Sequence, residues 1–351
     1  MPFLFIGSTG DKAGHSIISW AVADTLRNRG FRVGFFKPFG THPVQEQDVR
    51  SDADAFLFKK VLALETPVEH LCPYPAAEDI PVSRTSEELL TETAEKAEFL
   101  ARGADVLIVM GRTHMFLDDA SHPAPDVSVI NRLQADLLVV HRYRKLSTTR
   151  YSLLSIASLL KERLRAIVIN RIPAPDFERA VNSPAGSFDR SGMPPALLIP
   201  EDPRLNYQTL AGAARVLDAE VLSGGEFLQN TLVSKITVGS AVLPEALKLF
   251  RRVYHKLILL KPEADELPPT AESVAGIVLT GGGKPAPAVL ETAKRAGITL
   301  MAVQHDTFTS IDRLEHSSGR LTHYDQYKVE RLGEMMEQDG KMKKLIAALK
   351  L

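Results

Sequence analysis

The sequence is poor in cysteine, in net charge and in long apolar runs. Cys72 is the single cysteine among 351 residues, so no disulfide can form within the chain, and a lone thiol is typical of a reducing compartment. The formal net charge of −1 gives no overall attraction to nucleic acid or to an acidic membrane. The apolar start of the chain lacks a positive leader and a cleavage site, and no run approaches the ~18 apolar residues of a membrane span. We therefore expect a cytoplasmic protein with no nucleic-acid or membrane partner.

Several catalytic signatures are absent as well. The ten histidines show no close His and Cys pairs of the kind that bind zinc, so surface or capping roles are favoured. No Gly-x-Ser-x-Gly turn or Ser-His-Asp set supports acyl-enzyme chemistry. The basic run at residues 142–145, with Arg150, favours a solvated rim, and a contact to a nucleotide or acidic partner is the alternative.

The first half of the chain alternates apolar runs with helical patterns. Nearly continuous apolar runs are typical of parallel strands buried on both faces, so we predict a doubly wound, mostly parallel α/β sheet. The expected strands are Phe3–Ile6, Arg32–Phe36, Val106–Met110, Leu137–Val140, Ala166–Ile169 and Ala196–Ile199, and the expected helices are Ser16–Arg29, Asp52–Leu64 and Ser86–Arg102.

A second, smaller α/β block follows a Pro- and Gly-rich exit near residues 173–203 and a connecting helix at Tyr207–Leu217. We predict domains at 1–212 and 213–325 and a C-terminal helix at 326–351. The apolar residues of that helix should bury against its own domain or a second chain, and a homodimer and a soluble 215–351 fragment are expected. The block's expected strands are Lys235–Val238, Lys256–Leu260, Gly276–Leu279 and Ile298–Val303, and its helices are Leu243–Arg252 and Ala286–Arg295.

The turn Gly7–Ser16 between the first strand and helix has the form of a phosphate-binding loop. A glycine-rich strand-to-helix turn aims backbone N–H groups and the positive helix end at an anion. Such loops usually end Gly-Lys-Ser/Thr, and here Gly14 and Ser16 are kept while His15 takes the lysine position. Lys12 could supply charge instead. A glycine-rich turn without a ligand is the alternative.

Two further features favour a nucleotide site. Lys37 follows the second strand at the sheet edge where α/β ligands sit. Asp52 and Asp54 follow it, and with Ser16 they suit Mg²⁺ bound beside a phosphate, although acids favoured at a helix N-terminus are the alternative. We therefore expect ATP or a related nucleotide with Mg²⁺. Its predicted contacts are Gly10, Lys12, Ala13, Gly14, His15, Ser16, Lys37 and Asn170.

These segments resemble a known family. Residues 5–10 with Gly14, residues 34–38 and residues 52–55 look like the dethiobiotin-synthetase-like P-loop domain, which also forms the N-terminal part of some phosphotransacetylases. The resemblance covers about residues 1–212. It implies that Asn170, at the start of residues 170–173, lies on the base side of the nucleotide.

The second half resembles the DRTGG domain that follows this P-loop domain in those proteins. Residues 238–240, 276–282, 285–287 and 305–309 stand where that family's segments are expected, but residues 261–263 replace the naming motif. A phosphotransacetylase is not expected, because its catalytic domain would have to follow and the sequence ends at Leu351.

A second ligand site is conceivable in this half. Glycines after a strand can form an anion nest or a tight turn, and both interpretations stay open. The candidate residues are Gly281, Gly282, Gly283, His305 and Asp306.

The departures from the resembled family decide the functional hypothesis. Active members carry the loop lysine and a Glu-Gly after the central strand, where this chain has His15 and Met110-Gly111. A thioether neither coordinates Mg²⁺ well nor takes a proton. We expect no catalytic residues and a nucleotide-binding regulatory or scaffold protein with weak or no hydrolysis. The alternative is an ATP-dependent enzyme of the dethiobiotin-synthetase or amidoligase (cobyrinic acid a,c-diamide synthase-like) class that uses Lys12 and Lys37.

Overall fold

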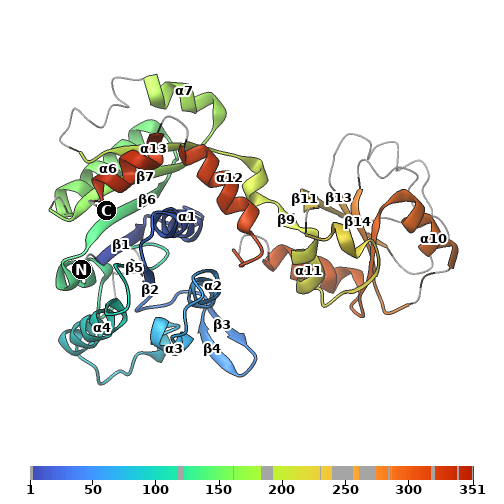
Figure 1. Ribbon diagram of the computed structural model, residues 1–351, viewed down its shortest axis with the longest axis horizontal. Helices are drawn as coiled ribbons and strands as arrows, with labels where there is room; N and C mark the ends of the chain where they lie inside the picture. The colour runs from blue at the N-terminus through green and yellow to red at the C-terminus, as the bar shows by residue number, and fades with distance from the viewer. Residues whose placement is uncertain are drawn as a thin grey trace. The chain divides into compact units, whose positions relative to one another are not determined.

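The computed structural model describes residues 3–116, 122–160, 162–182, 193–229, 231–238, 256–260, 274–283, 285, 287–317, 321–337, 340–349 and 351. The chain forms two compact units (Figure 1). The first combines Met1–Asp202 with Gln326–Leu351, and the second is Pro203–Asp325. None of the helices in the described ranges combines the length and apolar content needed to cross a membrane.

A six-stranded sheet forms the centre of the first unit. Every neighbouring pair in it is parallel, which confirms the predicted doubly wound architecture. Its strands are almost completely buried because helices cover both faces. The order across the sheet is β2 (Val33–Phe36), β5 (Val106–Met110), β1 (Phe3–Ser8), β6 (Asp136–Arg142), β7 (Leu164–Ile172) and β8 (Ala196–Pro200).

Two sets of helices cover this sheet. Apolar side chains of three helices join those of alternate strand residues, such as Phe5 and Val109, in one core cluster. These helices are α4 (Ser86–Ala101), α5 (Asp126–Leu133) and α6 (Leu146–Leu160). On the opposite face α1 (His15–Asn28) contacts β1, β2 and β5. The short helix α7 (Ala174–Asn182) connects β7 to β8.

A hairpin and two helices follow β2 at the carboxyl edge of the sheet. The hairpin strands β3 (Pro43–Glu46) and β4 (Val49–Asp52) are antiparallel, and α2 (Ala53–Val61) and α3 (Val68–Leu71) come next. The sequence did not predict the hairpin because β3 is largely exposed and shows no alternating apolar pattern. Asp52 ends the hairpin and caps α2, since its side chain accepts a hydrogen bond from Asp54 N.

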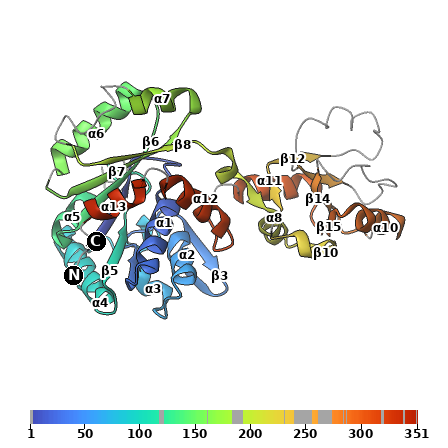
Figure 2. The same cartoon turned by 45° about the horizontal axis from the view of Figure 1, so that its top comes forward.

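The C-terminal tail belongs to the first unit. It forms two helices, α12 (Gln326–Glu337) and α13 (Lys341–Ala348), where one was predicted. In Figures 1 and 2 they lie with α1 and the β7–β8 edge of the sheet, and α12 contacts α1 and β8 while α13 contacts β7. Arg331 Nε also lies 2.8 Å from Asp202 Oδ2. The buried tail side chains include Val329, Leu332, Met335, Met336, Met342, Leu345, Ile346 and Leu349.

This packing corrects the expected role of the tail. Its apolar face is covered by the P-loop unit of the same chain, because α1 and the β7–β8 edge offer a matching apolar surface. The surface that motivated a dimer through the tail is therefore already buried. The second compact unit begins at Pro203, before the predicted domain start at residue 213, and Leu210 packs in its core.

The second unit contains a mixed five-stranded sheet. β10 pairs antiparallel with β15, and the remaining neighbours are parallel. The strand order is β10 (Glu220–Ser223), β15 (Thr299–Ala302), β14 (Val274–Leu279), β13 (Lys256–Leu260) and β12 (Lys235–Val238). Its other elements are β9 (Gln208–Thr209), β11 (Leu232–Val233), α8 (Leu210–Val216), α10 (Pro287–Ala296) and α11 (Thr307–Ser317). The expected helix at Leu243–Arg252 and residues 261–263 lie outside the described residues.

Candidate functional site

The loop between β1 and α1 presents unpartnered backbone donors. Gly14 caps α1 in the left-handed region, with φ +88°, and no side chain caps the helix. Within the described chain no protein group accepts a hydrogen bond from the N–H of Gly14, His15 or Ser16. A Cβ at position 14 would lie 2.6 Å from Asn170 Nδ2, so glycine is required there. The loop therefore has the geometry of an anion cradle at a helix N-terminus.

Asn170 braces this loop from the end of β7. Its Nδ2 donates to Ala13 O over 2.8 Å, and its Oδ1 accepts from Arg171 N over 2.9 Å. The side chain is buried, as is Ala13. Both ends of the amide therefore serve the protein itself, and the role that the structure gives Asn170 is to hold the loop in position.

His15 occupies the lysine position as a buried, neutral imidazole. Its Nε2 is buried and has no hydrogen-bond partner among the described residues. Burial lowers the pKa of His15 from 6.5 to about 4; Asp54 opposes this shift and Lys37 adds to it. At neutral pH the position that usually carries a permanent charge is therefore uncharged.

Acid should weaken the fold through His15. Because its folded-state pKa of about 4 lies below the ordinary 6.5, the unfolded chain takes up the proton first. Stability is complete above pH ~6.5 and falls as the pH drops toward 4, by about 3 kcal/mol for this side chain. His122 and His141 act in the same direction, because burial lowers their pKa values as well. Urea unfolding between pH 7.5 and 4 should be less pH-dependent in His15→Gln, and parallel curves for the two proteins would contradict this.

Lys37, Asp52 and Asp54 form a buried ion cluster beneath the loop. Lys37 Nζ lies 2.9 Å from Asp52 Oδ1 and 2.7 Å from Asp54 Oδ2, and the side chains of Lys37 and Asp52 are fully buried. Burial disfavours the charge on Lys37, but Asp54 and Asp52 outweigh it and raise the pKa of the ammonium. Burial likewise opposes the charge on Asp54, but Lys37 outweighs it and holds the pKa of that carboxyl far below its usual range. Lys37 and Asp54 are therefore both ionised at neutral pH.

The two carboxylates of this cluster differ in what they can still bind. Both oxygens of Asp52 are already used, because Oδ1 accepts from Lys37 and Asp54 N, and Oδ2 accepts from the N–H groups of Thr41 and His42. Asp54 is 12% exposed, and the Ser16 hydroxyl adds to Lys37 in lowering its pKa. Of the predicted metal ligands Ser16, Asp52 and Asp54, Asp52 is therefore the one whose two oxygens are both engaged by the protein. In the described residues no group of three or more His, Cys, Asp or Glu side chains could hold a metal by itself.

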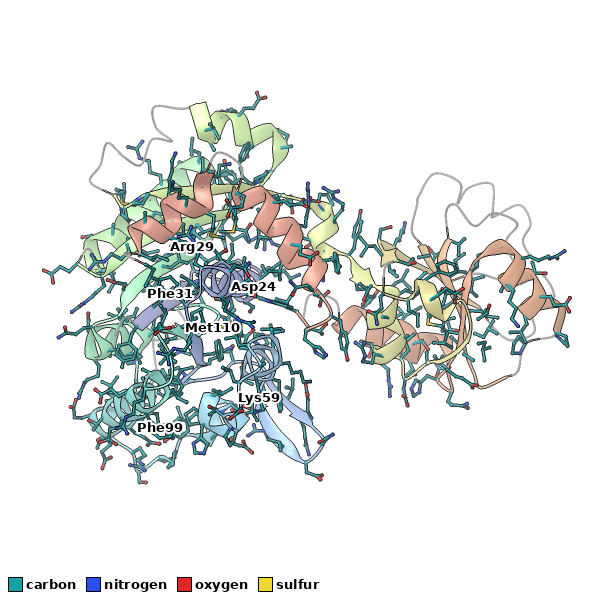
Figure 3. The ribbon with its side chains drawn as sticks, viewed as in Figure 1. Asp24, Arg29, Phe31, Lys59, Phe99 and Met110 are labelled. Atoms are coloured by element: carbon teal, nitrogen blue, oxygen red, sulfur yellow. The ribbon has the colours of Figure 1, made fainter. Side chains whose placement is uncertain are left out.

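The end of β5 carries a buried ion pair that sequence reasoning missed. Met110 is fully buried at the position where an acid was expected (Figure 3). Two residues later Arg112 Nη2 lies 3.2 Å from Asp126 Oδ1, and Arg112 N donates to Asp126 Oδ2. A Cβ at Gly111 would lie 2.5 Å from that same Oδ2. The position of Arg112 in the sequence could have indicated its role, because Arg112 and Lys37 follow adjacent parallel strands.

The remaining predicted contacts lie around the loop. Lys12 is exposed in the left-handed region, with φ +57°, while Gly10 is buried. The segment after β5 crosses beside the loop, since His114 forms a β-bridge with Thr9 and Met115 N donates to Ser8 O. The structure thus brings the loop residues, Lys37, Asp54 and Asn170 to one edge of the sheet.

The second predicted site lies in a tight turn of the second unit. Gly281 and Gly282 have φ +90° and +74°, and their N–H groups donate to His305 O and Val303 O. Asp306 caps α11 by accepting hydrogen bonds from Thr309 N and Oγ1. Because the N–H groups of Gly281 and Gly282 are already engaged, this geometry favours the turn interpretation at these two glycines.

Comparison with known families decides the assignment of both units. The model of a family described as AAA domain matches residues 3–209, more than half of the chain. This chain belongs to that family. A second model, the DRTGG domain, matches residues 213–317, and together they confirm the predicted order of a dethiobiotin-synthetase-like P-loop domain followed by a DRTGG domain.

Similar curated proteins fall into two groups. The phosphate acetyltransferase of Deinococcus radiodurans is 25% identical over 95% of this chain and 49% of its own length, and that of Pseudomonas aeruginosa is 22% identical over 96% and 50%. The ATP-dependent dethiobiotin synthetase BioD of Bacillus cereus strain G9842 is 24% identical over 66% of this chain and 96% of its own. The chain thus spans about half the length of the phosphate acetyltransferases and is homologous to their N-terminal region.

Solved structures give more distant matches. The MinD cell division protein of Aquifex aeolicus aligns with a TM-score of 0.35 and 14% identity, covering 58% of this chain and 84% of that one. The CBS and DRTGG domains of a Clostridium perfringens pyrophosphatase align with a TM-score of 0.29 and 16% identity, covering 50% and 71%. At these scores neither structure informs the site.

Proposed function

We propose that the P-loop unit binds ATP or a related nucleotide with Mg²⁺ and acts in regulation or as a scaffold, with weak or no hydrolysis. The observation that carries this proposal is His15, a buried and neutral side chain in the lysine position of a loop whose backbone donors are free for an anion. The DRTGG domain would then mediate association or bind a second small molecule.

The binding half of the proposal is supported by the loop and the two groups beside it. Backbone N–H groups at the start of α1 suit phosphate oxygens. Ser16 and Asp54 are neighbours, since the Ser16 hydroxyl lowers the pKa of Asp54, and hydroxyl and carboxylate oxygens are ligands that Mg²⁺ accepts. Mg²⁺ bound there would offset phosphate charge. The protein's own contribution is to hold Ser16 and Asp54 together under the loop.

The second half of the proposal, weak or no hydrolysis, is supported by the absence of a charged side chain at positions 15 and 110. His15 offers no cation to the developing negative charge of a transferring phosphoryl group. Met110 offers no carboxylate for metal or proton at the end of β5. Phosphoryl transfer depends almost entirely on such positioning and electrostatic stabilisation, so the loss of both should lower the rate severely.

The ATP-dependent ligase alternative is less well supported. It requires Lys12 and Lys37 to replace the loop lysine. Lys37 is fully buried and already binds two carboxylates, and releasing it would leave Asp52 without its buried counter-ion. Lys12 is exposed, so a charge there is weakened by solvent.

Restoring the lysine tests whether the loop still faces phosphate. In His15→Lys a permanent charge returns, and ATP with Mg²⁺ should bind more tightly by roughly ten- to a hundredfold, about 1–3 kcal/mol for a charge-assisted hydrogen bond. Calorimetric titration of wild type, His15→Lys and the neutral control His15→Gln measures this. Unchanged or weaker binding in His15→Lys would show that the loop no longer receives a phosphate.

A further inference from the structure

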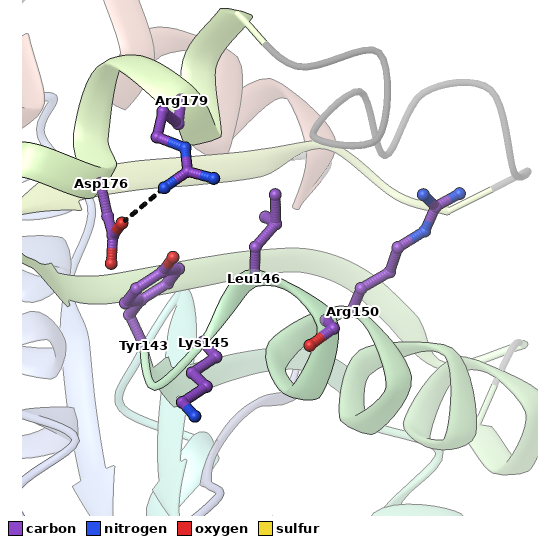
Figure 4. Close-up of a pocket in the computed structure, with 7 residues that line it drawn as sticks. Tyr143, Lys145, Leu146, Arg150, Asp176 and Arg179 are labelled. Carbon is purple, nitrogen blue, oxygen red and sulfur yellow. Dashed lines mark ion pairs between the residues drawn. The ribbon is translucent and has the colours of Figure 1, made fainter.

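A cavity of about 500 Å³ opens beyond the ends of β6 and β7, and none of the residues assigned to the nucleotide lines it. Such a volume lies in the range of small-molecule pockets. Figure 4 shows its walls, which come from three places: the β6–α6 connection, the start of α6, and α7. The lining residues are Tyr143, Lys145, Leu146, Ser147, Arg150, Asp176 and Arg179.

The charge of this cavity is unbalanced. Lys145, Arg150 and Arg179 line it against one carboxylate, Asp176, so the lining carries two net positive charges. Burial and the neighbouring Asp176 raise the pKa of the Tyr143 hydroxyl, and Asp176 lies 3.9 Å from Arg179. No carboxylate in the described ranges forms an ion pair with Lys145 or Arg150. The positive end of the α6 dipole adds to this field, because the helix begins at Leu146.

The shape of the lining suits a particular ligand. Figure 4 shows Arg150 from α6 and Arg179 from α7 on either side of Leu146, so guanidinium groups flank an apolar floor. Guanidinium groups bind phosphate and carboxylate oxygens in pairs of parallel hydrogen bonds. A phosphate monoester carries about −1.5 to −2 near pH 7, which matches the net charge of the lining.

We propose that this cavity binds a small organic phosphate monoester, separately from the nucleotide at the loop. Arg150 and Arg179 contact the phosphate, while Leu146 and the Tyr143 ring contact the organic part. The cavity wall is joined to the loop by two hydrogen bonds, because Tyr143 N donates to Asn170 O and Asn170 Nδ2 donates to Ala13 O. The basic run singled out in the sequence thus lines a ligand site at Lys145 and Arg150.

Calorimetric titration of the full chain with phenyl phosphate tests the proposal. Saturable binding is expected, weakened about tenfold or more in Arg150→Gln and in Arg179→Gln and only partly in Arg150→Lys, which keeps the charge. Arg29→Gln is the matched control, since Arg29 is an exposed cation of the same unit outside the cavity, and it should bind like wild type.

Three further measurements separate this site from the loop and from other anions. Ser16→Ala should leave phenyl phosphate binding unchanged, and saturating ATP should not displace the probe. Succinate, a dicarboxylate of similar charge, should bind at least tenfold more weakly. Absence of saturable binding, equal binding in the arginine variants, displacement by ATP, or equal affinity for succinate would each overturn the proposal.

Discussion

Replacing Lys37 with methionine is expected to lower the free energy of unfolding by about 3–5 kcal/mol, the range for a buried ion pair that loses one partner. Lys37 Nζ is the cation that Asp52 and Asp54 share, and all three side chains are almost or fully excluded from solvent. Without it two carboxylates remain charged in a buried space. The deficit should shrink toward pH 4, because the unpaired carboxylates can then be protonated.

Two control variants are needed to interpret this result. Lys60→Met breaks the exposed ion pair with Glu46, where both side chains are more than 40% exposed, and should change stability by no more than about 1 kcal/mol. Lys37→Met combined with Asp52→Asn and Asp54→Asn removes the buried charges together, and should recover part of the loss. Urea unfolding at pH 7.5 measures all three, and a Lys37→Met effect no larger than that of Lys60→Met would show that the cluster is not needed for stability.

Truncating the apolar face of the tail should destabilise the P-loop unit. Leu332 on α12 and Leu345 on α13 are completely buried, and each leucine-to-alanine change leaves a cavity worth about 2–5 kcal/mol. Leu159→Ala on α6 is the control, because that leucine is 69% exposed and its replacement should have little effect. Urea unfolding measures all three variants, and an effect of Leu332→Ala or Leu345→Ala no larger than that of Leu159→Ala would contradict the packing.

The same packing changes what deletion should do. A chain that ends at residue 325 exposes the surface of α1 and the sheet edge that α12 and α13 cover, so it should aggregate or unfold readily. Conversely, a fragment of residues 203–325 should be more soluble than one that runs on to Leu351. A stable, soluble 1–325 protein in light scattering would argue that the tail is dispensable.

The fold of the first unit could be predicted because its signals are local. Fully buried parallel strands read as continuous apolar runs, and Val106–Met110 was located to the residue. The capping box of Thr85 and Glu88 at α4 likewise marks a helix start in the sequence. The surface against which the tail packs could not be predicted. An apolar stripe on a helix indicates that this face is buried, but it does not indicate which surface covers it.

The same distinction between local signals and long-range contacts applies to the candidate site. The loop glycine, Ser16 and Lys37 have spacing that sequence reasoning recognises. The saturation of Asp52 by Thr41 and His42, and the Arg112–Asp126 pair beside Met110, depend on contacts between segments far apart in the chain. The base-side role of Asn170 stays a prediction, and the structure adds that its amide donates to Ala13 O. The type and position of the site residues could thus be predicted from the sequence, but their hydrogen-bond partners could not.

Phosphate release from ATP with Mg²⁺, measured beside a binding titration of the same protein, tests the central proposal most directly. Ser16→Ala serves as the control that removes the loop hydroxyl. The proposal predicts saturable ATP binding of micromolar affinity or weaker, with phosphate release no faster in wild type than in Ser16→Ala. Vigorous hydrolysis by the wild-type protein that Ser16→Ala abolishes would contradict it and would favour the ATP-dependent enzyme.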